Sequence, residues 1–324
     1  MASLSFSPLL IATLLSAAQQ PAVPIAALPD IPPPAVVTAP LTPGSWCNAP
    51  APERGLFESD HAFPGFVGPI TNPILTKDPR SLTEARVLFI NNEIDPGNPL
   101  GPGDFQVYAM ELRLALTDRL TIIADKDGYA EIHPAGAHTQ DGWLNMAFGL
   151  KYTLVRDVEH QSLLAAGFMF EPQMGEGRVF QNQGHGLYTA FLSGGQEFKE
   201  KYHLIGNFGY QFPTDPDQNS SFLYTSIHAD RQVCGWLYPL VEFNWFHYVA
   251  SGNRGIPAAV GEGDGLLNLG TTSIQGHNIA TGAAGVKAVL SKHMETGIAW
   301  EVPVSFPHHD LINNRITMEL ILRY

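Results

Sequence analysis

Apolar and polar residues alternate along most of the chain after residue 80, and this period of two is typical of β-strands with one apolar face. The last segment shows it most clearly, because Ile316, Met318, Leu320, Leu322 and Tyr324 share one face and mostly polar residues lie between them. The same alternation predicts twelve strands. They lie at 82–93, 104–116, 120–132, 143–155, 160–170, 187–197, 202–212, 221–229, 233–248, 279–290, 294–304 and 315–324.

The links between these strands alternate strictly between short and long. Transmembrane β-barrels have this arrangement, with short periplasmic turns, longer extracellular loops and an even number of strands. The longest link, 249–278, contains a short apolar stretch at 266–269. A thirteenth span there would break the alternation, so we assign 266–269 to the loop.

The composition favours a membrane barrel over a soluble sheet. Charged residues make up 15% of the chain, against about 25% in ordinary soluble domains. No apolar run approaches the roughly 18 residues of a helical span. Since only helices and closed barrels satisfy every backbone group in lipid, the sequence predicts an all-β fold, a transmembrane antiparallel β-barrel of about 12 strands. A soluble β-sandwich or propeller is the alternative, and long strands with so few charges fit it poorly.

The region before the strands divides into two parts. Residues 1–20 include an apolar run of signal-peptide length followed by small residues, although no Lys or Arg precedes Arg54. Ten of the residues in 21–52 are proline, and proline disfavours both helix and interior strand. We therefore expect a signal peptide at 1–20, a Pro/Gly-rich linker or plug segment at 21–79, and the barrel at 80–324.

Sequence motifs give little support to catalysis or metal binding. The net charge of −13 argues against a nucleic-acid partner, which would require a basic surface. Cys47 and Cys234 lack zinc-site spacing, and the GxSxG, HExxH and P-loop motifs are absent from the sequence. His308-His309-Asp310 and residues 125–128 supply too few ligands for a metal site. We expect no enzyme activity, cofactor or metal, and a barrel hydrolase is the less favoured alternative.

Several segments resemble a known family. They are 109–120 (AMELRLALTDRL), 125–129 (DKDGY), 141–152 (DGWLNMAFGLKY) and 313–324 (NNRITMELILRY). They are similar to bacterial outer-membrane proteins named for a role in the meta-pathway of phenol degradation, which are often described as transporters. The resemblance extends roughly from residue 80 to the end and concerns strands and turns more than a site. It implies a barrel in the bacterial outer membrane and uptake of aromatic compounds.

The polar faces of the predicted strands are expected to line the lumen. They carry both signs of charge, and Glu111 with Arg113 and Arg315 with Glu319 are spaced to pair. Such a wall either selects solutes by charge or closes a narrow lumen with ion pairs. The candidate lumen-lining residues are Glu111, Arg113, Asn145, Lys151, Asn207, Glu242, Asn244, Lys287, Glu295, Glu301, Arg315, Glu319 and Arg323.

These observations predict a porin-like channel or uptake protein for small aromatic or hydrophobic compounds. A structural or adhesive barrel with a closed lumen is the alternative. The expected partners are outer-membrane lipid and lipopolysaccharide, a small-molecule solute, and the barrel-assembly machinery, which would read the last strand ending in Tyr324. The lumen assignments depend on register, since a slip of one residue inverts a strand. They are weakest in 187–197, 221–229 and 279–290, where both faces are mixed.

Overall fold

The computed structural model describes residues 54–136, 138–199, 201–305 and 311–324. The predicted signal peptide, the tract at 21–53 with Cys47, and His308-His309-Asp310 lie outside the described residues.

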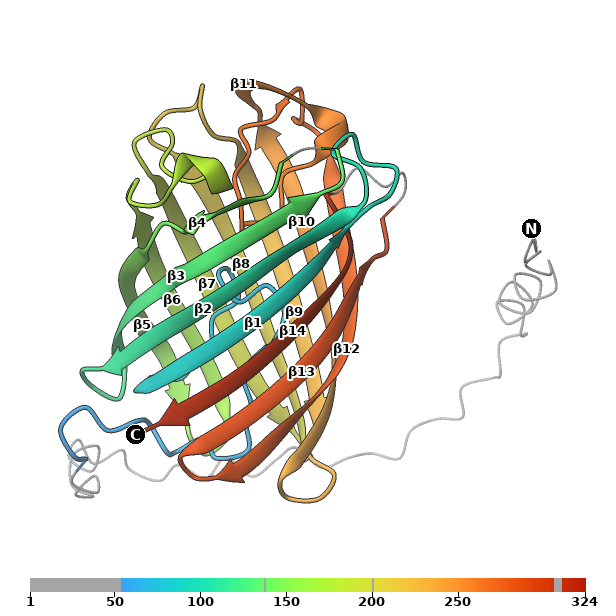
Figure 1. Cartoon of the computed structure of the whole chain (residues 1–324). Helices are drawn as coiled ribbons and strands as arrows, with labels where there is room; N and C mark the ends of the chain where they lie inside the picture. Colours follow the sequence, from blue (N-terminus) through green and yellow to red (C-terminus); the bar gives the residue numbers. More distant parts are fainter. Residues whose placement is uncertain (1–53, 137, 200, 306–310) are drawn as a thin grey trace, which may run out of the picture. The chain divides into compact units, whose positions relative to one another are not determined.

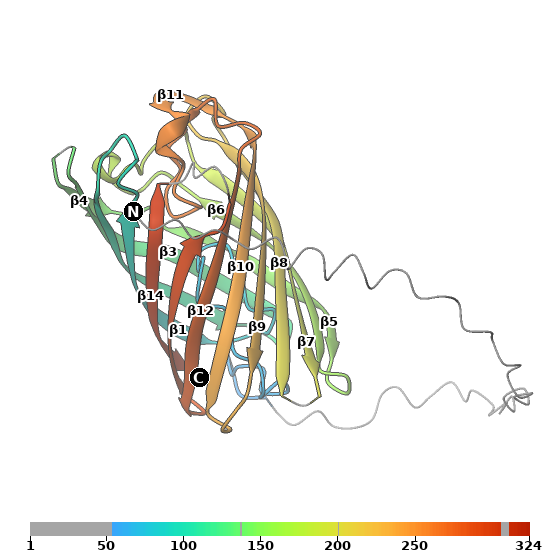
Figure 2. The ribbon, with the colours of Figure 1, turned by 90° about the vertical axis from the view of Figure 1, so that its right-hand side faces the viewer.

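The described part of the chain is built almost entirely of β-strands (Figures 1 and 2). The strands are β1 (Glu84–Ile94), β2 (Gly103–Ala115), β3 (Leu120–Pro134), β4 (Gln140–Trp143), β5 (Ala147–Asp157), β6 (Ser162–Glu171), β7 (Leu187–Phe198), β8 (Tyr202–Pro213), β9 (Ser221–Arg231), β10 (Leu237–Ala250), β11 (Gly252–Pro257), β12 (Asn278–Ser291), β13 (Met294–Pro303) and β14 (Ile312–Arg323). Two short 3-10 helices lie in the connections, η2 (Gly177–Val179) and η3 (Ala258–Val260). No helix among the described residues is long and apolar enough to cross a membrane.

The strands form one antiparallel sheet that closes on itself. Its order is β2-β1-β14-β13-β12-β10-β9-β8-β7-β6-β5-β3-β4, and the additional pairing of β2 with β3 joins its two ends. The short strand β4 pairs with the upper part of β3, and β5 pairs with the lower part. The barrel wall therefore has twelve strands, as the alternation of residues predicts.

One predicted strand differs from the structure. The segment 143–155 is divided into β4 and β5, and β3 changes partner at the break. Lys126 in β3 has a positive φ of 57°, a conformation that L-residues seldom adopt and that is common where a ladder is interrupted. The side chain of Asn145, within the break, accepts hydrogen bonds from the backbone amides of Met174 and Gly175. β11 was not predicted from the sequence.

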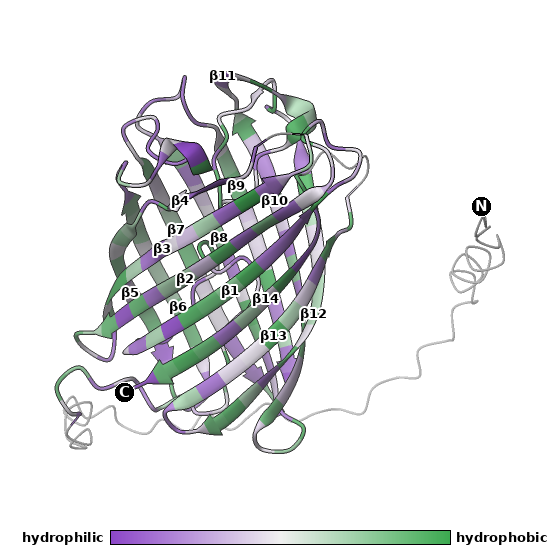
Figure 3. Ribbon diagram, viewed as in Figure 1, coloured by the Kyte–Doolittle hydropathy of each residue, from purple (hydrophilic) through white to green (hydrophobic). Residues whose placement is uncertain are grey.

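The two faces of the wall differ as the period-two pattern requires (Figure 3). In β8, Leu204 and Phe208 point outward and are exposed, whereas His203 and Asn207 point inward and are buried. A band of exposed apolar side chains around a closed barrel is the surface that a lipid bilayer covers.

An aromatic row near one end of the outer face supports this orientation. Tyr188 stacks on Phe168 and Phe212, with ring centroids 5.6 Å and 5.5 Å apart. Such rows mark the membrane–water interface of outer-membrane barrels. The row lies toward the end that carries the long connections, which we call the extracellular end. The short turns and the last residue, Tyr324, lie at the periplasmic end (Figure 1).

Candidate functional site in the barrel lumen

Residues 54–83, here called the lumen segment, begin outside the barrel at its periplasmic end and run into the barrel (Figures 1 and 2). Its base lies at the periplasmic end, where the amide of Ser59 donates to the carbonyl oxygen of Tyr324 over 2.9 Å. Most of its side chains are buried, among them Phe66, Ile70 and Leu75. The segment therefore occupies the periplasmic half of the lumen and reaches its middle.

The sequence explains why this segment has no regular structure of its own. Pro64, Pro69, Pro73 and Pro79 remove backbone donors and fix φ, so neither a helix nor a strand can extend through it. Its remaining backbone groups still need partners because they are buried. Side chains of the barrel wall supply many of these partners.

Glu242 of β10 holds the segment by its backbone. Its carboxylate accepts hydrogen bonds from the amide of Ile70 over 2.8 Å and from the amide of Thr71 over 2.7 Å. The hydroxyl of Thr71 also donates to it. One buried carboxylate thus binds two successive amides, and charge-assisted bonds of this kind are stronger than neutral ones.

A row of alternating histidines and carboxylates supports Glu242. Nδ1 of His228 lies 2.7 Å from Glu242, and Nε2 of His228 lies 2.9 Å from Asp230. Nδ1 of His203 lies 2.7 Å from the other oxygen of Asp230. Because both nitrogens of His228 face carboxylates, an imidazolium fits this position and fixes the orientation of Glu242.

Lysine and arginine side chains bind the carbonyl groups of the segment. Nζ of Lys287 donates to the carbonyl of Gly68 over 2.7 Å, and Arg86 donates to that of Pro69 over 2.9 Å. Nζ of Lys151 donates to the carbonyls of Asp78 and Arg80. These contacts bind main-chain carbonyl groups, so they depend on the conformation of the segment more than on the identity of its side chains.

The segment also carries charges of its own. Lys77 pairs with Asp125 of β3, and its amide donates to Asn207 over 2.9 Å. Asp78 and Arg80 pair within the segment over 2.6 Å. Burial alone would raise the pKa of the Asp78 carboxyl, but the charge and hydrogen bonds of Arg80, together with the charge of Lys151, hold this pKa well below its usual range.

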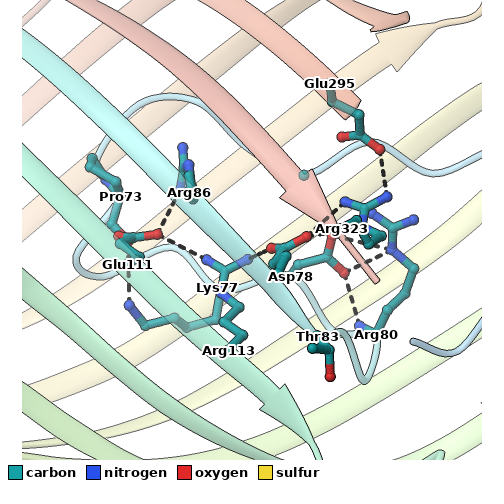
Figure 4. A network of polar contacts seen from close by, with 12 residues as sticks. Pro73, Lys77, Asp78, Arg80, Thr83, Arg86, Glu111, Arg113, Glu295 and Arg323 are labelled. Atoms are coloured by element: carbon teal, nitrogen blue, oxygen red, sulfur yellow. Dashed lines mark hydrogen bonds and ion pairs between the residues drawn. The ribbon is translucent and has the colours of Figure 1, made fainter. Parts of the chain in front are cut away.

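A network of ion pairs joins the wall strands around the segment (Figure 4). It alternates in sign and spans β1, β2, β13 and β14, with Lys287 of β12 at its edge. The pairs are Arg86 with Glu111 and Glu319, Arg113 with Glu84 and Glu111, Arg323 with Glu84 and Glu295, and Lys287 with Glu319.

Little space remains between this network and the segment. The cavity lined by Arg86, Arg113, Lys287, Asp78 and their neighbours has a volume of about 10 Å³. That is room for about one water molecule. The lumen segment therefore fills the periplasmic half of the lumen.

The extracellular half of the lumen has a different lining. Ile90, Phe105, Val107 and Ile132 form one buried apolar cluster on β1, β2 and β3. A second cluster contains Ile123, Ala147, Met169, Phe191, Phe222, Tyr224, Phe246, Tyr248 and Ile279. We call these two clusters together the inner apolar wall.

A segment of the longest extracellular connection covers this wall. Residues 258–274, here called the inner strap, carry Val260, Leu266, Leu267 and Leu269 into the first cluster and Ile274 into the second. Leu75 of the lumen segment packs into the second cluster from below. The strap and the lumen segment meet where Leu75 lies beneath Gly265.

Twelve of the thirteen lumen candidates are buried, and Arg323 is partly exposed. Glu111 and Arg113 lie 3.2 Å apart, as their spacing suggests. The expected pairing of Arg315 with Glu319 is wrong, because Arg315 binds Glu301 over 3.2 Å and Glu319 binds Arg86 and Lys287. For Arg315 and Glu319, partners on other strands thus take precedence over each other.

The remaining candidates contact the wall, the lumen segment or a connection. Asn244 donates to Thr71 and Glu301, Asn207 accepts from Lys77, and Asn145 binds Glu171. The structure adds inward groups that the sequence did not single out. These are Glu84, Arg86, Asp125, His203, His228 and Asp230. Their position on the polar face of each strand was a usable signal. The mixed faces of 221–229 hid His228, and Asp230 lies just beyond this predicted strand, which the structure extends to Arg231.

The metal candidates stay without support from the structure. Among the residues that the structure describes, no group of three or more His, Cys, Asp or Glu side chains is placed to hold a metal ion. The only cysteine described, Cys234, is exposed and unpaired in the turn between β9 and β10.

Comparisons by sequence place the chain in no family. No family model matches it, and no curated protein does. Solved structures do match. The COG4313 outer membrane channel from Pseudomonas putida F1 covers 80% of this chain and 100% of its own, with 10% identity and a TM-score of 0.54.

Two porins share the architecture more loosely. The NanC porin covers 75% of this chain and 99% of its own, with 5% identity and a TM-score of 0.48. The KdgM porin covers 74% and 99%, with 9% identity and a TM-score of 0.42. These likenesses are too distant to carry an argument. The fold itself is that of a bacterial outer-membrane protein, a closed antiparallel β-barrel of twelve strands with a channel-like architecture.

Proposed function

We propose that the protein is an outer-membrane channel for small solutes, with residues 54–83 as a plug in its periplasmic half. We further propose that uncharged aromatic or hydrophobic compounds are among its solutes. The observation that carries the proposal is the division of the lumen. Its periplasmic half is charged and filled by a separate segment, and its extracellular half is apolar and covered by a loop.

The contacts of the lumen segment support a plug that can leave. The segment pairs with no strand of the sheet, and side chains such as Glu242, Lys151 and Lys287 hold its main chain. Its departure would break hydrogen bonds and ion pairs but would leave the twelve-strand ladder intact. The wall left behind would be lined by paired charges, which suits a hydrated path.

The inner apolar wall supports the choice of solutes. Interiors of outer-membrane channels are usually polar, so a dry apolar lining near the entrance calls for a specific reason. An uncharged solute with apolar groups gains free energy by burial there, at roughly 25 cal/mol per Å² of apolar surface. The resemblance of segments 109–120 and 313–324 to the phenol-degradation family agrees with this choice.

A structural or adhesive barrel with a permanently closed lumen is the second candidate. The filled periplasmic half, with its cavity of about 10 Å³, favours it. A barrel hydrolase is the less favoured third reading, and the solved structure that matches with a TM-score of 0.54 is described as a channel. Lipopolysaccharide, the barrel-assembly machinery, a signal peptide at 1–20 and a linker at 21–53 remain predictions.

Uptake by whole cells separates the first two candidates. In a strain that lacks the protein, we expect slower initial uptake of benzyl alcohol at limiting concentration, with glucose uptake unchanged as the control. The wild-type gene should restore the rate. Equal benzyl alcohol uptake with and without the protein, in an otherwise normal envelope, would contradict the channel and favour the structural barrel.

A further inference from the structure

The inner strap is attached to the rest of the protein in a way that differs from the lumen segment. Its hydrogen bonds go to neighbouring extracellular segments, and Asp264 also lies 3.9 Å from Arg315 of β14. The side chain of Asn268 binds the backbone of Ser220 at 2.9 Å in both directions, and the amide of Arg254 donates to the carbonyl of Gly270 over 3.2 Å. Against the inner apolar wall, the strap presents leucine and isoleucine side chains.

Apolar contacts between the strap and the inner apolar wall can be replaced by apolar contacts between a solute and the same wall. A solute that replaces the side chains of Leu266, Leu267 and Leu269 loses no hydrogen bond, because those side chains make none. Glycines form the turns of the strap and of the segment that follows it. Gly261 and Gly270 of the strap have φ angles of 84° and 62°, and Gly276, just beyond its end, has a φ of 84°; glycine adopts such angles without strain.

The lower part of the wall carries polar atoms that lack partners among the described residues. They are the hydroxyl of Tyr224, Nδ2 of Asn207 and Oε1 of Gln211. All three side chains are at least 97% buried. Tyr224 lies across Gly209, between Asn207 and Gln211 on the inward face of β8. Unpaired buried polar atoms cost free energy, of the order of 1–3 kcal/mol each.

We propose that the inner apolar wall is a solute-binding site that the inner strap occupies as a built-in competitor. Its ligands are small uncharged molecules with an apolar body and one hydrogen-bonding group, which Tyr224, Asn207 and Gln211 receive. The proposal deepens the proposed channel function and rests on it for the role of the bound solute. Binding of solute and docking of the strap exclude each other, so solute lifts the strap from the wall.

Thiol labelling of the strap tests this directly. In a chain with Cys47→Ser and Cys234→Ser, Leu267→Cys places a buried thiol in the strap, since Leu267 is 2% exposed. A membrane-impermeant maleimide then reports how often the strap is lifted. Asn253→Cys, at an exposed position of β11, is the matched control for reagent and bilayer effects.

We expect benzyl alcohol to raise the labelling rate of Leu267→Cys saturably, by about fivefold or more, since ligand shifts a two-state equilibrium by its differential affinity. Benzoate, which is charged, should have no effect, and the rate at Asn253→Cys should stay constant. Adding Phe246→Leu should move the response to higher concentration. Tyr224→Phe keeps the shape of the wall but removes the hydroxyl. Toluene lacks the hydroxyl group of benzyl alcohol, so in this chain benzyl alcohol should no longer raise the labelling rate more than toluene does.

Each outcome decides the proposal. A labelling rate at Leu267→Cys that benzyl alcohol leaves unchanged would overturn it. The proposal would also fail if adding Phe246→Leu or Tyr224→Phe left the responses to benzyl alcohol and toluene as they are without these changes, because this would indicate a bilayer effect. The proposed function fails separately. Saturable labelling with no loss of uptake in cells lacking the protein would leave the site standing and remove the channel. Slower uptake in cells lacking the protein, together with no labelling response, would remove the site and leave the channel standing.

Discussion

Glu242 joins the barrel wall to the lumen segment through a single carboxylate. It accepts from the amides of Ile70 and Thr71 and is oriented by His228. Removing one partner of a buried charged pair is costly because the other charge stays buried and unpaired. The state of the lumen should therefore depend strongly on this residue.

The first prediction concerns Glu242→Gln. The amide has one acceptor oxygen where the carboxylate has two, and its NH₂ group faces donors, so docking of the segment should weaken by ~2 kcal/mol. A free-energy change of that size raises the undocked fraction about 30-fold. Proteolysis of reconstituted protein at Lys77 and Arg80, which are buried when docked, measures this fraction. Glu159→Gln, at an exposed turn, is the matched control, and equal cleavage of both variants would contradict the prediction.

The second prediction concerns pH and the inner strap. Burial raises the pKa of the Glu262 carboxyl, although hydrogen bonds from Ser220 and from the amides of Thr271 and Leu269 lower it in part. The docked strap thus binds this proton more tightly than the free strap does. Docking is stronger at low pH and weakens as pH rises from the ordinary value, about 4.3, through the raised one.

Labelling of Leu267→Cys, divided by that of Asn253→Cys to remove the intrinsic pH effect on thiols, should increase between pH 5 and pH 7.5. Glu262→Gln should flatten this increase because it removes the titrating group. A ratio that rises equally in both chains would show that Glu262 is not the group responsible.

At the scale of elements, the strands of the barrel could be predicted, whereas the filling of its lumen could be predicted only in part. Alternation in segments such as 202–212 and 315–324 fixes which residues face lipid, because the bilayer tolerates few polar side chains. The division of 143–155 could not be predicted, since it depends on Asn145 binding a connection some 30 residues away.

The lumen was harder to predict than the outer face. A polar inward face predicts contact with water, with ions or with another segment equally well, so the thirteen candidates did not reveal that the lumen is filled. The Pro-rich composition of 21–79 allowed both linker and plug. The apolar half of the lumen escaped prediction because Phe222, Phe246 and their neighbours make both faces apolar at the extracellular ends of β9 and β10, and alternation gives no signal there.

The third prediction fixes the lumen segment at its base. The hydroxyls of Ser81 and Thr121 lie 2.9 Å apart and both side chains are buried, so Ser81→Cys with Thr121→Cys should form a disulfide under oxidation without moving the backbone. The oxidised pair should reduce cleavage at Lys77 and Arg80 in the Glu242→Gln chain, and dithiothreitol should restore it. Cleavage that ignores the redox state would show that the segment leaves without freeing residue 81.

At the scale of the molecule, the barrel combines a fixed wall with two inserted segments. The ladder of twelve strands closes without either segment. Hydrogen bonds and ion pairs with the wall hold the lumen segment, whereas the contacts of the strap with the inner apolar wall are apolar. The two insertions therefore respond to different conditions. Loss of charge contacts should free the lumen segment, and an uncharged solute should free the strap.

The most direct test of the central claim is single-channel conductance of the Glu242→Gln, Ser81→Cys, Thr121→Cys protein in a planar bilayer, with both native cysteines replaced by serine. We predict discrete conductance steps under dithiothreitol and their loss on oxidation, in the same membrane and reversibly. A folded barrel that shows no steps in either redox state would contradict the claim that residues 54–83 are a releasable plug.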